Sequence, residues 1–398
     1  MARIIGPEGG GDILWLHGAS AGELLAAVPV VRALRRRRKL RLLATAGSPS
    51  ANVAFAALEP DFGGPPPLDC RRDCEKAFAA VRPGVLVLPR GDVWPSMVSA
   101  AVRRGVPVVI TGGVVRSRSN RLRTPARQLL ARSYARLSAV GAATAADAER
   151  LARLGVSPDV TVVTGDPAFD SVLASTAETA TDNVGGPLRL IAGSTWPEDE
   201  AALIAAWDRL SRGASSRRQL QLVLVPHEPT RRAVAHLTLR LERAGHGCTL
   251  WSERPDVLAG AGAEARSAGV VVVDRVGILG DLYGSANMAY VGGGLPRKGR
   301  LGLRGLHNVL EPAAAGLPVV FGCRHDREDA RGLEAAGGGF SVSGESLIPT
   351  LRRLLDHAAR HDAGRRARQY VLAGAGAAEP TADLIESVWP ERPPASTR

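Results

Sequence analysis

Glu23 is the residue that could most simply act as a general base, because it follows a short apolar run and a turn of small residues, Gly18 to Gly22. A carboxylate in such a turn leaves room for an acceptor hydroxyl and can take its proton. Ser20 stands three residues before Glu23, which is also the spacing of a capping box, in which both side chains bind backbone N–H groups at a helix start. Spacing alone leaves both interpretations of Glu23 open, and Ser20 becomes a candidate for contact with the acceptor.

Asp92 is a second acidic candidate, since it follows another apolar run that ends at Pro89. With Pro95 close behind it, Asp92 is typical of a turn or a helix start. As chemistry, Asp92 would bring a second acid into the same cleft, with Arg90 beside it.

Seven arginines recur between Arg116 and Arg136, with leucines and Tyr134 among them. The pattern predicts a charge-rich helix whose charged side is either a solvated face or a surface for anionic lipid. Arg116 and Arg118, at the start of this stretch, are candidate acceptor contacts.

The second half of the chain carries turns that could hold a nucleotide. Gly193, Ser194 and Thr195 follow an apolar run and open a predicted helix, where backbone N–H groups can hold an anion. Thr195 and Glu198 also have the spacing of a capping box. The next apolar run leads into a turn that contains His227, which on its own is a plain turn.

The most informative stretch begins with three consecutive glycines, Gly292 to Gly294, directly after an apolar run. Glycines there let the backbone approach a phosphate closely, and the cations that follow, Lys298 among them, could neutralise it. Asn308 and Glu311 again have capping-box spacing, but a carboxylate at a helix start can also accept hydrogen bonds from ribose hydroxyls. We interpret the combination as a nucleotide site.

The elements that must position these residues are short β-branched runs alternating with helical stretches. Runs too apolar to alternate, joined by helices, predict parallel sheets covered on both faces. We expect an α/β chain of two doubly wound, Rossmann-like domains, 1–180 and 187–398, joined by a linker at Thr176–Pro187 and facing across a cleft. The strands expected are Ile13–His17, Arg41–Thr45, Val85–Pro89, Val106–Thr111, Ala139–Gly141, Val160–Thr164, Leu188–Ala192, Leu220–Val225, Val270–Val273, Met288–Val291, Leu317–Phe321 and Phe340–Val342.

Composition narrows the classes of protein further. The chain has 398 residues, is 45% apolar and carries a net charge of +12, so it can bury a large core and could meet anionic partners. No apolar run approaches the roughly 18 residues that a membrane span needs, and we expect a cytoplasmic location. Aromatic residues make up only 4%, which disfavours nucleic-acid binding by base stacking. Four scattered cysteines predict reduced thiols and no zinc framework.

These stretches, in this order, resemble the 3-deoxy-D-manno-octulosonic acid (Kdo) transferases of lipopolysaccharide synthesis, glycosyltransferases of the GT-B architecture. The similarity runs from about Ile13 to about Phe340 and differs from the family pattern at Arg90, Gly112, Ala168 and Trp196. Its anchors are His17–Glu23, Asp92–Pro95, Arg116–Ser119, Gly165–Asp170, Ala192–Thr195, Val225–Pro229 and Gly292–Gly294 followed by His307–Gly316.

The resemblance implies transfer of an ulosonic acid from its CMP-activated form to a lipid A-type glucosamine acceptor, with inversion and without a metal or other cofactor. Glu23 matches the family's general base. Positions near the CMP moiety are matched by Gly193, Ser194, Thr195, His307, Asn308 and Glu311. The family fold further implies that the basic first half lies against the inner face of the inner membrane. Two other functions remain open: a non-catalytic binder of a nucleotide or anionic lipid, and an enzyme like the UDP-sugar epimerases.

Overall fold

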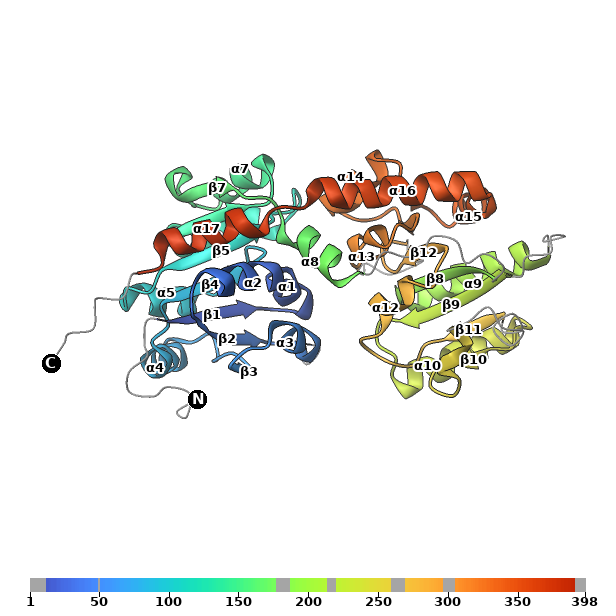
Figure 1. The fold of residues 1–398 in the computed structure, drawn as a ribbon, viewed down its shortest axis with the longest axis horizontal. Coiled ribbons are helices and arrows are strands. Elements are labelled where there is room, and N and C mark those ends of the chain that lie inside the picture. The colour runs from blue at the N-terminus through green and yellow to red at the C-terminus, as the bar shows by residue number, and fades with distance from the viewer. Residues whose placement is uncertain are drawn as a thin grey trace. The chain divides into compact units, whose positions relative to one another are not determined.

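The computed structural model describes residues 12–48, 51–176, 187–212, 220–258, 269–295 and 305–390. The chain divides into two compact units (Figure 1). The first consists of Met1–Ala174 and Gly374–Arg398, and the second of Ser175–Ala373. Most of the predicted linker, residues 177–186, lies outside the described residues.

The first unit is built on a parallel sheet of seven strands in the order β3-β2-β1-β4-β5-β6-β7. The strand order reverses between β1 and β4, and ligands of doubly wound sheets bind beyond the carboxyl ends of strands at such a point. The turns that carry Glu23 and Asp92 follow these two strands. The strands are β1 (Ile13–Gly18), β2 (Arg41–Ala46), β3 (Phe62–Gly64), β4 (Val85–Pro89), β5 (Val108–Gly113), β6 (Ala139–Ala142) and β7 (Thr161–Val163).

Helices connect these strands and cover both faces of the sheet. The stretch after β1 forms two helices because the chain breaks at Ala27, and Pro29 then occupies the first turn of the second helix, where its missing N–H costs no hydrogen bond. The helices are α1 (Ala21–Ala26), α2 (Val28–Arg37), α3 (Asn52–Leu58), α4 (Arg71–Val81), α5 (Pro95–Arg103), α6 (Ala126–Tyr134), α7 (Ala145–Arg153) and α8 (Pro167–Ser175), with 3-10 turns at Asn120–Leu122 and Pro158–Val160.

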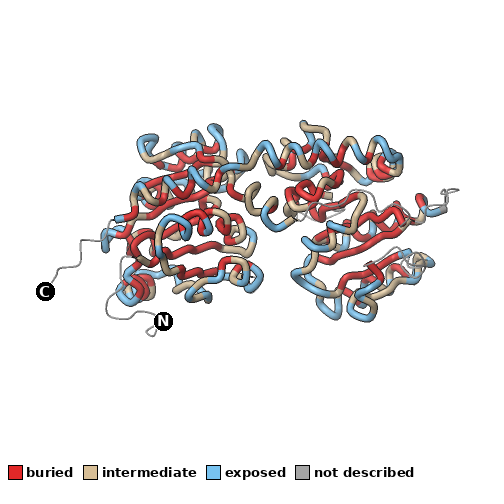
Figure 2. The backbone as a smooth tube through the Cα atoms, viewed as in Figure 1, coloured by how far each residue is buried: buried red, intermediate tan, exposed pale blue. Residues whose placement is uncertain are grey.

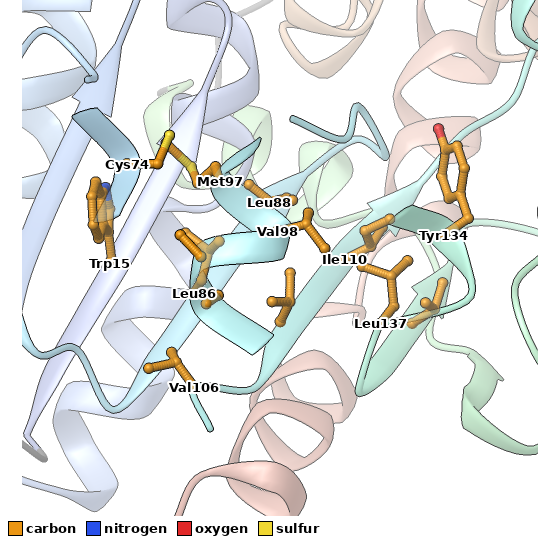
Figure 3. Packing of buried hydrophobic residues seen from close by; sticks show 14 of the residues in the cluster. Trp15, Cys74, Leu86, Leu88, Met97, Val98, Val106, Ile110, Tyr134 and Leu137 are labelled. Carbon is orange, nitrogen blue, oxygen red and sulfur yellow. The ribbon is translucent and has the colours of Figure 1, made fainter. Parts of the chain in front are cut away.

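Two apolar clusters, one on each face, hold the first sheet. In one of them Trp15 packs against Phe78 with ring centroids 4.8 Å apart, and Leu86, Met97 and Ile110 extend the cluster along the sheet (Figure 3). Burial of these side chains is the main stabilising contribution, since each contributes about 1.5–3 kcal/mol. The carboxyl edge of the strands is thereby held rigidly enough to position a site.

The last helix, α17 (Ala378–Val388), belongs to the first unit, so the expected domain 187–398 ends too late. Its apolar side, with Ala382, Ile385 and Trp389, lies in the core cluster of α1 and α2. Arg37 of α2 pairs with the carboxylates of Glu379, Asp383 and Glu386, and the Arg38 guanidinium lies 4.0 Å from the centre of the Trp389 ring. The arginine run that ends α2 therefore holds the returning chain.

The second unit has the same plan, with seven parallel strands in the order β10-β11-β9-β8-β12-β13-β14. Its strand order reverses between β8 and β12. The strands are β8 (Leu188–Thr195), β9 (Leu220–Pro226), β10 (Thr249–Leu250), β11 (Val270–Val272), β12 (Met288–Val291), β13 (Val319–Gly322) and β14 (Gly339–Val342). The helices are α9 (Pro197–Arg212), α10 (Arg231–Arg243), α12 (Leu279–Tyr283), α13 (Leu310–Ala314), α14 (Glu328–Ala335), α15 (Leu347–Leu355) and α16 (His357–Gly374), with a 3-10 turn at Pro255–Leu258.

Burial follows the strands closely, and the central strands are red along most of their length (Figure 2). All twelve strands expected from the sequence are present, and their ends agree to within three residues. The strands that the sequence did not predict are the edge strands β3 and β10, which have three and two residues. Neither of them contains the run of β-branched residues on which the other predictions rest.

Candidate active site

Glu23 lies in the first turn of α1, directly after the carboxyl end of β1. Ser20 is the N-cap, and its Oγ accepts a hydrogen bond from the Glu23 N–H at 3.4 Å. The Glu23 Oε2 atom accepts a hydrogen bond of 2.5 Å from the Ala19 N–H, one residue beyond the usual capping-box partner. Among the described residues, the other oxygen, Oε1, has no hydrogen-bond partner. Glu23 therefore binds the backbone at the helix start through one oxygen, and its other oxygen has no partner among the described residues.

Glycines shape the space around this carboxylate. A Cβ atom on Gly18 would lie 3.2 Å from the Glu23 Cβ and 3.3 Å from its Oε2, so a larger residue would push the side chain aside. Gly22 is exposed, and a Cβ there would meet no atom within 4 Å. Glu23 is half-buried, and burial raises its pKa, with a further upward contribution from the nearby Asp92 carboxylate. A raised pKa makes the carboxylate a stronger base when it is ionised.

Asp92 is exposed and lies in the turn between β4 and α5. Its Oδ1 is 2.9 Å from a guanidinium nitrogen of Arg121. Arg121 also donates to the carbonyl of Gly91 at 2.6 Å and contacts the Tyr134 hydroxyl at 3.0 Å, so it fixes the turn. Arg90, beside Asp92, adopts a left-handed backbone and pairs with Asp166. The sequence missed Arg121 as a positioning residue because its partners are distant in the chain.

The arginine-rich stretch is helical only in its second part, α6, because residues before Pro125 form a 3-10 turn and extended chain. Arg116 and Arg118 precede the helix and are exposed. The prediction of one helix across the whole stretch was therefore wrong. No contact in the described structure assigns these two arginines to an acceptor.

His17, at the end of β1, is a buried group of this edge that the sequence did not single out. Its Nδ1 lies 3.0 Å from the Thr45 hydroxyl and 3.1 Å from the Thr45 carbonyl, and its ring meets the edge of Trp94 with centroids 4.8 Å apart. Burial lowers its pKa to about 4, so the imidazole is neutral at physiological pH. Its Nε2 has no hydrogen-bond partner within the described part of the chain.

In the second unit, Asp199 ties together the two turns that follow β8 and β12. Its Oδ2 accepts hydrogen bonds from the N–H groups of Trp196 at 2.9 Å and Gly293 at 3.0 Å, and its Oδ1 accepts one from the Tyr290 hydroxyl at 2.7 Å. Asp199 is 1% exposed, and burial raises its pKa. A proline followed two residues later by an acid, as in Pro197 and Asp199, is typical of a helix start. This pattern could have identified Asp199 as a capping residue from the sequence.

The expected capping box of Thr195 and Glu198 does not form, because Thr195 is the last residue of β8. Asp199 instead accepts the hydrogen bond of the Trp196 N–H at the helix start. The Thr195 hydroxyl lies 3.5 Å from Oε1 of Glu200. Ser194 has a left-handed backbone, with φ of 53°, which turns the chain from the strand into α9. Gly193 is packed so closely that a Cβ would lie 2.4 Å from the Tyr283 hydroxyl.

The three glycines after β12 are required by contacts between backbone segments. A Cβ atom on any of the three would overlap a carbonyl oxygen of another segment. The distance would be 2.0 Å from Gly292 to the Ser194 oxygen, 2.3 Å from Gly293 to the Gly305 oxygen and 2.6 Å from Gly294 to the Gly322 oxygen. The Gly292 N–H donates to the Gly193 carbonyl at 2.8 Å, and the Gly293 N–H donates to Asp199. These two amides are thus engaged within the protein, so close packing accounts for the glycines without a phosphate.

Aromatic rings gather beyond the carboxyl ends of β8, β9 and β12. The His227 and His307 rings stack with centroids 4.2 Å apart, and the Trp196 ring lies 4.5 Å from His227 and 5.8 Å from His307. Burial, with help from neighbouring His227 and Arg327, lowers the pKa of His307 to about 4. The sequence pattern could not predict this cluster, because its members come from three separate turns.

Asn308 and Glu311 face each other at the start of α13. The Asn308 Nδ2 donates to Glu311 Oε1 at 3.0 Å, while its Oδ1 accepts from the Leu310 N–H at 3.0 Å. Burial raises the pKa of Glu311. Lys298 lies outside the described residues. Across the residues that the structure describes, no three His, Cys, Asp or Glu side chains converge as metal ligands.

Residues 2–171 match the family model described as 3-deoxy-D-manno-octulosonic-acid transferase (kdotransferase). A 3-deoxy-D-manno-octulosonic acid transferase from Bordetella pertussis is 28% identical over 94% of this chain and 86% of its own length, and other enzymes of that name match at 25–27% identity. The chain is a relative of the Kdo transferases. The resemblance drawn from the sequence motifs is thereby confirmed.

Solved structures confirm that this Kdo transferase relative has the GT-B architecture. A glycosyltransferase from Rickettsia africae covers 94% of the chain, and the chain covers 98% of it, with a TM-score of 0.59 and 11% identity. The UDP-GlcNAc 2-epimerase from Neisseria meningitidis bound to UDP-GlcNAc has a TM-score of 0.63 at 12% identity and covers 94% of this chain and 99% of its own. At such identities the likeness shows the fold alone. Family relation and fold together are those of a glycosyltransferase.

Membrane association was also expected from the sequence. Within the described ranges, every helix is too short or too polar to span a bilayer.

Proposed function

We propose that the chain transfers Kdo or a related ulosonic acid from its CMP-activated form to a lipid A-type acceptor in lipopolysaccharide synthesis. Two facts support this proposal: the relatives are named for Kdo transfer, and Glu23 presents a carboxylate oxygen without a protein partner in the described structure. The observation that carries the proposal is the position of the Glu23 carboxylate, directly after β1, where the strand order of the first unit's sheet reverses.

In the proposed reaction, Glu23 Oε1 takes the proton of an acceptor hydroxyl as the hydroxyl oxygen attacks the anomeric carbon of the sugar. The bond from that carbon to the CMP phosphate oxygen breaks, and CMP leaves with the electron pair. A single displacement of this kind inverts the anomeric configuration. The Ala19 N–H holds Oε2 and so fixes the direction of the carboxylate, while Asp92 raises its basicity through repulsion.

We propose that the second unit binds the CMP part of the donor through the turns at Gly193–Thr195, His227, Gly292–Gly294 and His307–Glu311. The amides of Gly292 and Gly293 are already engaged, so side chains of these turns, rather than those two amides, would meet the charge of the leaving phosphate. We propose further that this charge stabilisation needs no metal, as the resemblance implies.

The acceptor is a lipid, so we propose that the chain acts at the inner face of the inner membrane. The exposed arginines Arg116, Arg118, Arg127 and Arg132 support this, because Leu129, in the same helix as the last two, is also 73% exposed. Cations beside an exposed leucine suit anionic headgroups above an apolar layer.

The test is release of CMP from CMP-Kdo with and without a lipid A-type acceptor. We expect release that depends on the acceptor, with a product heavier by one sugar in mass spectrometry. Binding of CMP without product over a broad acceptor panel would instead make the chain a non-catalytic binder. Epimerisation of a UDP-sugar would show that it shares the reaction of its structural neighbours and would overturn the proposal.

A further inference from the structure

A cavity of about 190 Å³ opens on the second unit at the amino ends of β12 and β13. The candidate nucleotide turns follow the carboxyl ends of β8, β9 and β12, so the cavity lies at the opposite edge of the sheet. Four residues at about 3.3 Å each separate the two edges by about 13 Å. The cavity is lined by Ala286, Asn287, Gly316, Leu317, Pro318, His357, Arg360, His361, Arg365 and Arg368.

The basic side chains of this lining all come from one side of α16. Three arginines and two histidines recur there at helical spacing, and no carboxylate is among the described residues that line the cavity. Asp362, the one acid within α16, pairs with Arg365 and Arg366. Because all three side chains are 42–52% exposed, solvent screens these ion pairs and weakens the neutralisation of the arginines. The opposite wall, with Leu317 and Pro318, is apolar.

The walls are fixed by contacts that do not depend on a ligand. Arg360 is 7% exposed and donates to the carbonyl oxygens of Leu354 and Leu355 at 3.1 and 3.0 Å, which caps the end of α15. Arg368 donates to the Ala314 carbonyl at 2.8 Å. A Cβ on Gly364 would lie 2.1 Å from the Gly316 carbonyl oxygen, so the helix is packed directly on the turn before β13.

A buried cation stands behind the remaining wall. Arg189 is 0% exposed, its backbone N–H donates to Asn287 Oδ1 at 2.8 Å, and its guanidinium donates to the Ser285 carbonyl at 2.9 Å and to Gln221 at 2.6 Å. One of its nitrogens has no partner, and none of its partners in the described chain is a carboxylate. Its positive charge adds to that of the α16 arginines.

We propose that this cavity binds a phosphate monoester, with the phosphate on the arginines and histidines of α16 and a short apolar part against Leu317 and Pro318. Arginine forks match the geometry of phosphate oxygens, and a doubly charged phosphate balances several cations better than a single carboxylate. The volume equals that of about six water molecules, enough for a phosphate and a few carbon atoms. Either a soluble phosphate ester or the headgroup of an anionic lipid supplies this chemistry.

Calorimetric titration of the full chain with glycerol 3-phosphate, at fixed low salt, tests the proposal. Arg365→Gln removes a cation of the lining, whereas Arg366→Gln removes the neighbouring arginine, which shares Asp362 but lies outside the cavity. We expect Arg365→Gln to weaken binding at least about fivefold, as loss of one charge-assisted contact should, and Arg366→Gln to leave it unchanged. His361→Gln, also exposed and in the lining, provides a second variant that should weaken binding.

Sedimentation with vesicles containing phosphatidic acid separates the two sources of the phosphate. Vesicle binding that falls in Arg365→Gln but not in Arg366→Gln, without binding of the soluble ester, assigns the site to a lipid headgroup. Equal effects of the two arginine substitutions, or no binding of either probe, would overturn the proposal. Because neither probe is a nucleotide sugar, failure here leaves the proposed transferase reaction standing.

Discussion

Asp199 provides a sharp test of how the second unit holds its two candidate turns. Three donors converge on its carboxylate: the N–H groups of Trp196 and Gly293 and the Tyr290 hydroxyl. Asp199→Ala leaves all three without a partner in a site that is 1% exposed. At about 1–3 kcal/mol for each buried unsatisfied donor, we expect a loss of unfolding free energy of about 3 kcal/mol or more.

Asp199→Asn separates the hydrogen bonds from the charge. The amide oxygen can keep both backbone bonds, and the Tyr290 hydroxyl can turn to accept from the amide NH₂. The substitution also removes a carboxylate whose ionised form burial disfavours. We therefore expect Asp199→Asn to stay within about 1 kcal/mol of the parent protein.

The assay is urea unfolding of both variants, with hydrogen exchange of the peptide that contains Gly293 as a local measure. Asp199→Ala should speed exchange of the Gly293 amide, and Asp199→Asn should not. Glu198→Gln, on the neighbouring half-buried residue, serves as the control. If Asp199→Asn were as damaging as Asp199→Ala, the negative charge rather than the hydrogen bonds would hold the turns, and the reasoning would be refuted.

Three further predictions follow from the geometry. Gly193→Ala should destabilise the second unit by about 1–3 kcal/mol in thermal unfolding, because the new Cβ would lie 2.4 Å from the Tyr283 hydroxyl. The control Gly22→Ala should be neutral or slightly stabilising, because its Cβ would meet no atom within 4 Å. The pKa of His17, lowered to about 4, means that the unfolded chain binds a proton between pH 6.5 and 4 that the folded chain does not. The folded chain therefore loses stability as the pH falls from 7 to 5. His17→Asn should make this difference in unfolding free energy smaller by about 2 kcal/mol. An unchanged difference would contradict the lowered pKa of His17. Asp92→Asn should lower the pKa of Glu23 and move the acid limb of the pH–rate profile to lower pH, because it removes a neighbouring negative charge that Arg121 offsets only in part. A shift to higher pH would show that the two carboxylates do not repel.

The fold could be predicted from the sequence because its signals are local. Apolar β-branched runs such as Val85–Pro89 and Met288–Val291 coincide with strands, and the residues that follow them lie at the carboxyl edge of a sheet. For the same reason Glu23 could be placed at a helix start directly after a strand.

Features that depend on contacts distant in sequence were not predicted. The return of α17 to the first unit rests on its contacts with α2, more than 340 residues earlier. The role of Arg121 likewise requires Gly91 and Tyr134 to be brought together by folding. The close packing of Gly292–Gly294 was not predicted either, because the backbone segments that crowd these glycines are distant in the sequence.

The most direct test of the proposed catalysis compares Glu23→Gln with Ser20→Ala in the CMP-release assay with acceptor. Glu23→Gln keeps an oxygen for the Ala19 N–H but cannot take a proton, so we expect it to remain folded and to lose at least about 100-fold in turnover. Ser20→Ala removes the cap on the Glu23 N–H, so we expect it to lose about 1 kcal/mol of stability and to keep its kcat, whereas loss of a contact between Ser20 and the acceptor would raise KM. Full turnover by Glu23→Gln would show that Glu23 only caps α1 and is not the base.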